Sequence, residues 1–363
     1  MTSISEVDSV PKTKKPSDSA FKQQRLPAWQ PILTAGTVLP TFFVIGIAFI
    51  PVGIGLLYFS DQVKEYIIDY TDCNSTNYFH SNTLPITCAD FIANNPNATP
   101  PCACEIEFKL PSDFNGKVYM YYGLTNFYQN HRRYVKSRDD NQLLGQLSDV
   151  VSVDCGPFAF DGNKSIVPCG AIANSLFSDE LKLFSKRHTE WVPLLRTGIA
   201  WPSDKNIKFK NPDGDLKEAF KNYAKPKNWN KNIYDLDPDD ESNNGLQNED
   251  LIVWMRTAAL PTFRKLYRRV DHSVHGFTGG LLTGQYVLHV NYSYPVSAFD
   301  GKKRMILSTT SLLGGKNPFL GIAYIVVGCL CLLLGITLLI IHIKCSKSIT
   351  EMINVSPTTP YQE

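Results

Sequence analysis

Two long stretches of the chain contain no charged side chain, and each is long enough to cross a membrane. The second stretch covers residues 317–343, which include no Asp, Glu, Lys or Arg. As an α-helix rising about 1.5 Å per residue, it exceeds the roughly 30 Å hydrocarbon core of a bilayer. Prolines interrupt the start of the first stretch, so we predict a span over 33–59, bent at Pro40 and Pro51.

These spans divide the chain into five parts. We predict a cytosolic tail over 1–32, a transmembrane helix over 33–59, a lumenal or extracellular domain over 60–316, a second helix over 317–343 and a cytosolic tail over 344–363. Basic residues before span one and after span two favour cytosolic termini. Other basic residues, at 302–304 and 316, lie on the opposite side and weaken the charge argument.

Cysteines and glycosylation acceptors indicate where the middle part resides. Six of nine cysteines lie between the spans, and an even number suits an oxidising compartment: Cys73, Cys88, Cys102, Cys104, Cys155 and Cys169. The same segment carries four N-glycosylation acceptors at Asn74, Asn97, Asn163 and Asn291. Of fifteen possible pairings, geometry disfavours a direct bond between Cys102 and Cys104, and twelve stay open. A local Cys155–Cys169 pair is plausible.

The hydrophobic pattern of the middle part is typical of strands with irregular connections. Over 286–294, apolar and aromatic residues alternate with more polar ones, which predicts a strand with one buried face. Residues 117–122 and 304–312 are also strand-like, whereas 250–259 and 262–269, separated by Pro261, predict short helices. The fold class is therefore an integral membrane protein: two transmembrane α-helices flank a large, disulfide-bonded, glycosylated domain rich in antiparallel β-structure.

Composition and motifs argue against several functions. The formal net charge of +2 gives no field that attracts nucleic acid. The sequence has no phosphate-binding loop, no Asp-Lys-Thr-Gly phosphorylation signature, no Gly-x-Ser-x-Gly elbow and no His-Glu-x-x-His helix. His272 and His275 are best interpreted as residues of a solvated loop, and adjacent Asp139 and Asp140 as a turn paired with Arg138. We predict no catalytic residue, no metal site and no cofactor.

Two basic clusters and a glycine pattern suggest contacts. Residues 131–136 and 264–269 interleave aromatic residues with cations and can meet lipid headgroups or an acidic partner, although internal pairing is at least as plausible. Glycines recur every seven residues in both spans and allow close helix packing: Gly46 and Gly53 in the first, and Gly321, Gly328 and Gly335 in the second. The two spans can pack on each other; we favour packing that includes a second protein.

Five longer motifs resemble one known family. The chain is similar, from about residue 20 to 343, to the accessory (beta) subunits of phospholipid flippases, of the cell-division-cycle-protein-fifty type. The matching runs are FKQQRLPAWQP at 21–31, NFYQNHRRYVKSRDD at 126–140, PCGAIANS at 168–175, IVWMRTAALPTFRKLY at 252–267 and GGKNPFLGIAY at 314–324.

The resemblance implies a non-catalytic subunit that forms a heterodimer with a type-4 P-type ATPase, in contact with membrane lipids. The ATPase moves aminophospholipids from the exoplasmic to the cytosolic leaflet; the subunit supports its folding, exit from the endoplasmic reticulum and activity. The implied locations are the endoplasmic reticulum, Golgi, secretory vesicles and plasma membrane. The implied disulfides are nested, Cys73 with Cys104 and Cys88 with Cys102, beside Cys155 with Cys169.

This chain departs from the family pattern at a few positions. A usual pair of tryptophans is Trp201-Pro202 here, and the approach to span two reads Ser311-Leu312-Leu313 in place of Ser-Trp-Met. The alternative function is a two-span oligomeric channel or receptor with a large extracellular domain. It predicts polar pore-lining residues, which the apolar spans lack.

Overall fold

The computed structural model describes residues 17–26, 34–80, 84–95, 100–148, 150–311 and 314–345. The chain forms two compact units. One comprises Met1–Gly55 with Phe319–Glu363, and the other comprises Leu56–Pro318.

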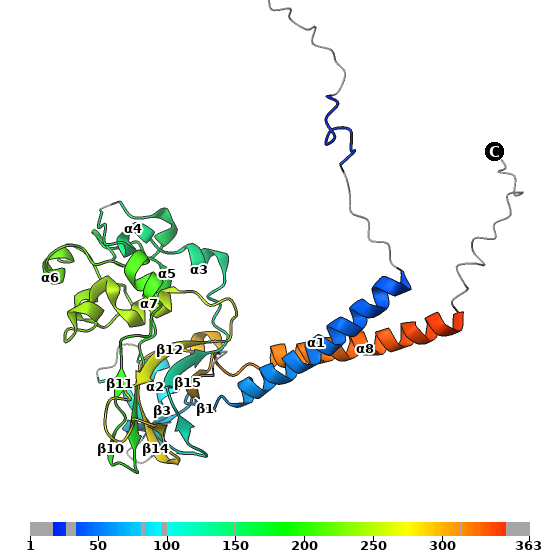
Figure 1. Cartoon of the computed structure of the whole chain (residues 1–363). Coiled ribbons are helices and arrows are strands. Elements are labelled where there is room, and N and C mark those ends of the chain that lie inside the picture. The colour runs from blue at the N-terminus through cyan, green and yellow to red at the C-terminus, as the bar shows by residue number, and fades with distance from the viewer. Residues whose placement is uncertain are drawn as a thin grey trace, which may run out of the picture. The chain divides into compact units, whose positions relative to one another are not determined.

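The first unit contains most of the long apolar helix α1 (Ala35–Asp61) and the whole of a second one, α8 (Phe319–Cys345), drawn in blue and orange in Figure 1. Each has 27 residues and is apolar enough to cross a membrane. At about 1.5 Å per residue each is roughly 40 Å long, more than the hydrocarbon core requires. Helix α1 continues through Pro40 and Pro51. Two helices of this kind support an integral membrane protein.

The second unit contains two larger antiparallel sheets within the described residues (Figure 1). The first has five strands in the order β1 (Glu65–Asp69), β15 (Lys303–Thr309), β6 (Val118–Leu124), β12 (Phe263–Val270) and β11 (Leu194–Leu195). The second has six, in the order β10 (Glu190–Trp191), β9 (Glu180–Ser185), β14 (Gly284–Tyr292), β4 (Cys102–Leu110), β2 (Asn74–His80) and β3 (Leu84–Thr87). The predicted fold class of two apolar helices with a domain rich in antiparallel β-structure is confirmed.

Smaller elements complete this unit. Two short ribbons pair β5 (Phe114–Asn115) with β13 (Gly280–Leu281) and β7 (Phe160–Asp161) with β8 (Lys164–Ser165). The short helices are α2 (Cys88–Asn94), α3 (Arg132–Lys136), α4 (Asp140–Leu143), α5 (Ala171–Asn174), α6 (Leu216–Ala219) and α7 (Glu249–Met255). Single turns at Val153–Cys155, Ile233–Asp235, Glu241–Asn243, Gly245–Gln247 and Ser297–Phe299, and a π-helical turn at Asp204–Lys208, lie between them.

The predicted alternation in the last third of the chain is confirmed. Tyr286, Leu288, Val290 and Tyr292 of β14 are all at most 1% exposed, because this face packs into the core. Residues of both sheets, such as Met120 and Leu307 from one and Leu183 and Leu288 from the other, belong to one continuous core. Burial of alternate residues therefore holds the two sheets together.

The prediction of a helix over 262–269 is wrong. This segment is β12, paired with β6 on one side and β11 on the other. Its basic residues obscured the alternation, because Lys265 and Arg268 are buried here with polar partners. The predicted helix over 250–259 is shorter than expected, since α7 ends at Met255.

Candidate interaction surfaces

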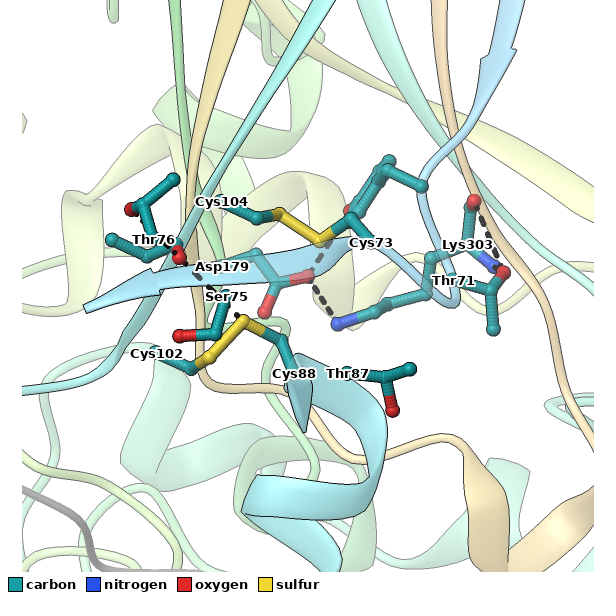
Figure 2. Close-up of a disulfide and its surroundings, with 12 residues drawn as sticks. Thr71, Cys73, Ser75, Thr76, Thr87, Cys88, Cys102, Cys104, Asp179 and Lys303 are labelled. Atoms are coloured by element: carbon teal, nitrogen blue, oxygen red, sulfur yellow. Dashed lines mark hydrogen bonds and ion pairs between the residues drawn. A yellow bond between two sulfur atoms is a disulfide. The ribbon is translucent and has the colours of Figure 1, made fainter. Parts of the chain in front are cut away.

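Nested disulfides fasten the second sheet to helix α2. Cys73 pairs with Cys104 and Cys88 with Cys102, the arrangement that the family resemblance implies (Figure 2). Cys102 and Cys104 lie on β4, and Cys88 opens α2, whose N-terminus is capped by the Thr87 hydroxyl accepting from Asp90 N–H. The two bonds are adjacent, with the sulfur atoms of Cys73, Cys88 and Cys104 within 4.8 Å of one another. Because these sulfurs are oxidised, the cluster offers no thiolate to a metal.

A fully buried ion pair connects the two sheets beside these disulfides. Lys303 Nζ on β15 lies 2.6 Å from Asp179 Oδ2, just before β9, and both side chains have no exposed surface (Figure 2). The Asp179 carboxylate also accepts from the backbone N–H groups of Ser293 and Tyr294, each at 2.7 Å, and from the Tyr70 hydroxyl at 3.1 Å. These four donors satisfy the carboxylate.

The lysine of this pair also has partners besides the carboxylate. Its ammonium group donates to the Tyr294 carbonyl at 2.8 Å and lies over the Tyr292 ring. Burial lowers the Lys303 pKa to about 8, although the Asp179 charge opposes the shift. The Tyr292 hydroxyl is buried and has no hydrogen-bond partner within the described part of the chain. The site is thus a rigid, charged link inside an otherwise apolar core.

The third disulfide, Cys155–Cys169, holds a separate small lobe. Both cysteines are buried with Ile166 in a cluster distinct from the main core. The bond connects the turn at Val153–Cys155 to the start of α5. Asp139 reinforces this lobe, because its carboxylate caps α4 and accepts from Ser152 N–H at 2.9 Å. Arg138 pairs with Asp140 at 2.8 Å, as predicted for this turn.

The histidines of the predicted loop are not equivalent. His272 is half-buried: its Nε2 accepts from Val118 N–H at 3.1 Å and its Nδ1 lies 2.7 Å from the Phe277 carbonyl oxygen. This corrects the solvated-loop interpretation for His272, because its ring joins the loop to the start of β6. His275 is exposed, as expected.

The glycines of both helices lie where α1 and α8 contact each other. A Cβ atom on Gly53 would lie 2.9 Å from the Gly321 carbonyl oxygen, and one on Gly328 would lie 3.3 Å from that of Gly46. A Cβ on Gly335 would meet aromatic side chains of α1 at about 3.4 Å. The glycines therefore permit the two spans to pack on each other, the alternative that the sequence left open. Exposed aliphatic residues such as Val44 and Ile47 lie outside this contact.

Trp201 is an exposed aromatic residue, and hydrogen bonds hold the backbone just before it. The Trp201 side chain is 63% exposed, and the Arg256 guanidinium lies 5.3 Å from its ring centroid. Below it, the buried Glu249 carboxylate accepts from the N–H groups of Ile199 at 2.7 Å and Ala200 at 2.9 Å. Burial would raise the Glu249 pKa, but these donors and Lys205 lower it, so the carboxylate stays ionised.

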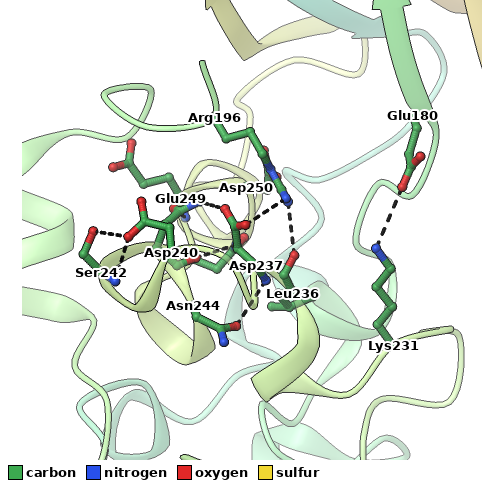
Figure 3. A network of polar contacts seen from close by, with 12 residues as sticks. Glu180, Arg196, Lys231, Leu236, Asp237, Asp240, Ser242, Asn244, Glu249 and Asp250 are labelled. Atoms are coloured by element: carbon green, nitrogen blue, oxygen red, sulfur yellow. Dashed lines mark hydrogen bonds and ion pairs between the residues drawn. The ribbon is translucent and has the colours of Figure 1, made fainter. Parts of the chain in front are cut away.

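A groove of about 1300 Å³ lies in the domain. Its lining includes the aromatic residues Trp191, Trp229 and Tyr267. One wall is fixed by ion pairs, in which Arg196 lies between Asp237 and Asp250, each at 3.2 Å (Figure 3).

The cations of the second basic cluster predicted from the sequence have partners within the chain. Arg264 pairs with Glu65, and Arg268 pairs with Asp250. Lys265 donates to the carbonyls near the end of α7, those of Val253 at 2.9 Å, Trp254 at 2.8 Å and Arg256 at 2.6 Å. Burial lowers the Lys265 pKa to about 7, helped by the nearby Arg256 charge. Internal pairing with carboxylates is therefore confirmed for Arg264 and Arg268, whereas Lys265 has carbonyl partners.

Three of the predicted glycosylation acceptors lie among the described residues. Asn74 at the start of β2 and Asn163 in the turn between β7 and β8 are exposed. Asn291 on β14 is partly exposed, and its amide donates to Glu180 at 3.3 Å. Asn97 lies outside the described residues. Glycosylation of these positions stays a prediction.

Sequence reasoning did not identify Asp179, Lys303 or Glu249 as residues of buried polar contacts. Asp179 and Lys303 are 124 positions apart and lie in no recognisable motif. One local signal existed, because Lys303 falls on the inward face of a strand-like segment. A lysine at such a position indicates a buried carboxylate partner.

Comparison with known proteins places the chain in a family. The model of the LEM3 (ligand-effect modulator 3) family / CDC50 family matches residues 56–348. Cell cycle control protein 50A of Mus musculus is 55% identical over 93% of this chain and 92% of its own length. Cell cycle control protein 50B of Homo sapiens is 47% identical over 91% and 94%, and putative ALA-interacting subunit 4 of Arabidopsis thaliana is 40% identical over 90% and 89%. The chain therefore belongs to the CDC50 (LEM3) family, which its sequence motifs had indicated.

Proposed function

We propose that this chain is the non-catalytic accessory subunit of a phospholipid flippase. Its membership of the CDC50 family carries the proposal, and one relative's name, ALA-interacting subunit, describes a protein that acts through a partner. In this proposal the partner is a type-4 P-type ATPase that hydrolyses ATP and moves aminophospholipids from the exoplasmic to the cytosolic leaflet. The chain and the ATPase form a heterodimer, with both termini of the chain in the cytosol.

The structure supports a binding role. Helices α1 and α8 already pack through their glycines, so a partner in the membrane would meet their outer aliphatic faces. In the lumenal domain, Trp201 is a large exposed aromatic residue on a supported loop, a combination common at the centre of protein interfaces. We assign both surfaces to the ATPase.

The proposed role of the chain includes maturation of the ATPase. The chain would help the ATPase to fold, leave the endoplasmic reticulum and complete its transport cycle, in the Golgi, secretory vesicles and plasma membrane. A disulfide-bonded domain with glycan acceptors at Asn74, Asn97, Asn163 and Asn291 suits this pathway.

The test is co-expression of the full chain with individual type-4 P-type ATPases, followed by recovery under mild detergent. We expect one or more ATPases to be recovered and to mature their glycans only when the chain is present. Trp201→Ala should lower this recovery, whereas Trp191→Ala, which alters another half-exposed tryptophan, should leave it unchanged. A chain that folds and matures its own glycans but recovers no ATPase would refute the proposal and favour a channel or receptor.

A further inference from the structure

The first basic cluster of the sequence differs from the second because its arginines and its lysine pair with no carboxylate among the described residues. Arg132, Arg133 and Lys136 on α3 are exposed, and no carboxylate lies within 4.0 Å of any of them in the part of the chain that the structure describes. The nearest basic neighbour with a partner, Arg138, is paired with Asp140. Three adjacent like charges repel one another, so an anion that meets them together gains affinity.

These cations line one side of a hollow. A cavity of about 400 Å³ is lined by Arg132, Arg133 and Lys136 with Val153, Asp154 and Gly156. Asp154 is the one acidic residue in this lining, so the hollow keeps an excess of positive charge. Guanidinium groups bind phosphate oxygens through paired hydrogen bonds, and a lysine adds a compact charge.

The hollow rests on a firm base. Helix α3 is anchored by Tyr134, whose hydroxyl lies 2.8 Å from the Ser175 hydroxyl and whose ring packs edge-on against Phe127. The opposite wall, at Val153–Cys155, is held by the Cys155–Cys169 bond. The side chains around the hollow are therefore presented by fixed backbone on both sides.

One valine in the lining of the hollow is almost fully exposed. Val153 is 96% exposed, although apolar side chains of this kind gain from burial. Cations flanked by exposed aliphatic residues are typical of surfaces that bind the interfacial region of a bilayer.

We propose that the hollow formed by α3 and the Val153–Cys155 turn binds the phosphate-bearing headgroup of an anionic phospholipid. The phosphodiester lies between Arg132, Arg133 and Lys136, and Val153 contacts the adjoining apolar part of the same lipid. The site is on this chain, so it does not depend on the proposed ATPase partner.

The test uses the full chain in nanodiscs and measures amide hydrogen exchange in segments 131–137 and 150–156. One set of discs contains phosphatidylcholine alone, and a second contains about one-fifth phosphatidylserine. We expect phosphatidylserine to slow exchange in both segments at least threefold, and 0.5 M salt to reverse most of the protection. A triple variant, R132Q with R133Q and K136Q, should lose the protection.

Matched controls separate this site from general charge. The triple variant R187Q with K210Q and K217Q removes three exposed cations elsewhere in the domain and should keep the protection. Soluble glycerophosphoserine added to phosphatidylcholine discs should protect weakly; equal protection at the same concentration would show a site for free phosphoesters and overturn the assignment to lipid. Protection that requires an added ATPase, and no lipid, would assign the surface to an acidic protein segment. Exchange that none of these additions slows would refute the proposal.

Discussion

The buried Asp179–Lys303 pair gives the sharpest test of the fold. Asp179→Asn removes the negative charge but keeps an oxygen for the N–H groups of Ser293 and Tyr294. It leaves the Lys303 ammonium in a core with no exposed surface, with the Tyr294 carbonyl as its remaining oxygen partner in the described chain. An unpaired buried charge of this kind costs about 3–5 kcal/mol of unfolding free energy.

The opposite single change should cost less. Lys303→Met leaves the Asp179 carboxylate with three donors, the two backbone N–H groups and the Tyr70 hydroxyl. We therefore expect a loss near the lower end of the same range, about 3 kcal/mol. The double variant carries neither charge and places a flexible apolar side chain beside Tyr70 and Tyr292. Since replacing a whole buried pair is often nearly neutral, it should cost less than either single variant.

Thermal unfolding of the full chain in mild detergent, with disulfides intact, measures these effects. For a domain of this size about 1 kcal/mol corresponds to 2–4 °C, so Asp179→Asn should lower the Tm by roughly 6–20 °C. The control is Lys302→Met, which alters the exposed neighbouring lysine and should change stability by no more than about 0.5 kcal/mol. If the two single losses simply add in the double variant, the ion pair has no coupling energy and the reasoning is wrong.

Four further predictions follow from other described features. Cys155→Ser should cost about 3 kcal/mol and retain the chain in the endoplasmic reticulum, as read from glycan maturation; normal delivery of the variant would contradict this. Gly328→Leu should separate α1 from α8, measured by loss of a cross-link between cysteines placed on the two helices, with Gly55→Leu, a glycine with open space around it, as control. Tyr292→Phe removes an unpaired buried hydroxyl and should leave the Tm unchanged or raise it; a clear fall would reveal a partner for that hydroxyl. Finally, burial lowers the pKa of Lys265 to about 7, so between about pH 7 and 10 the unfolded chain binds more protons at this site than the folded one. The unfolding free energy should therefore rise with pH in this window, by up to about 1.4 kcal/mol per unit, and Lys265→Met should reduce the slope.

Local sequence patterns were sufficient to predict the elements that have a whole face in an apolar environment. The two apolar helices and the β14 strand follow from composition and alternation, because lipid or core surrounds whole faces of them. The wrong helix at 262–269 shows the limit: Lys265 is on an inward face because it donates to carbonyls at the end of α7, a contact that no local pattern indicates. The same holds for Asp179, whose partner is 124 residues away.

The sequence also predicted only part of the interaction surfaces. Glycine spacing indicated close helix packing. It did not identify the helix that packs against the glycines, because that depends on the position of the second span in the folded chain. The two basic clusters looked alike in sequence. In one, Arg264 and Arg268 pair with Glu65 and Asp250; in the other, the cations of α3 lie exposed beside a hollow. That difference arises from tertiary contacts and was visible only in the structure.

The nesting of two disulfides has a consequence for the order of oxidation. Cys88 and Cys102 are 14 residues apart, whereas Cys73 and Cys104 are 31 apart. Once the inner bond forms, the covalent path between Cys73 and Cys104 runs through it and shortens to about half. Loop closure then costs roughly 0.5 kcal/mol less, so the inner bond favours formation of the outer one.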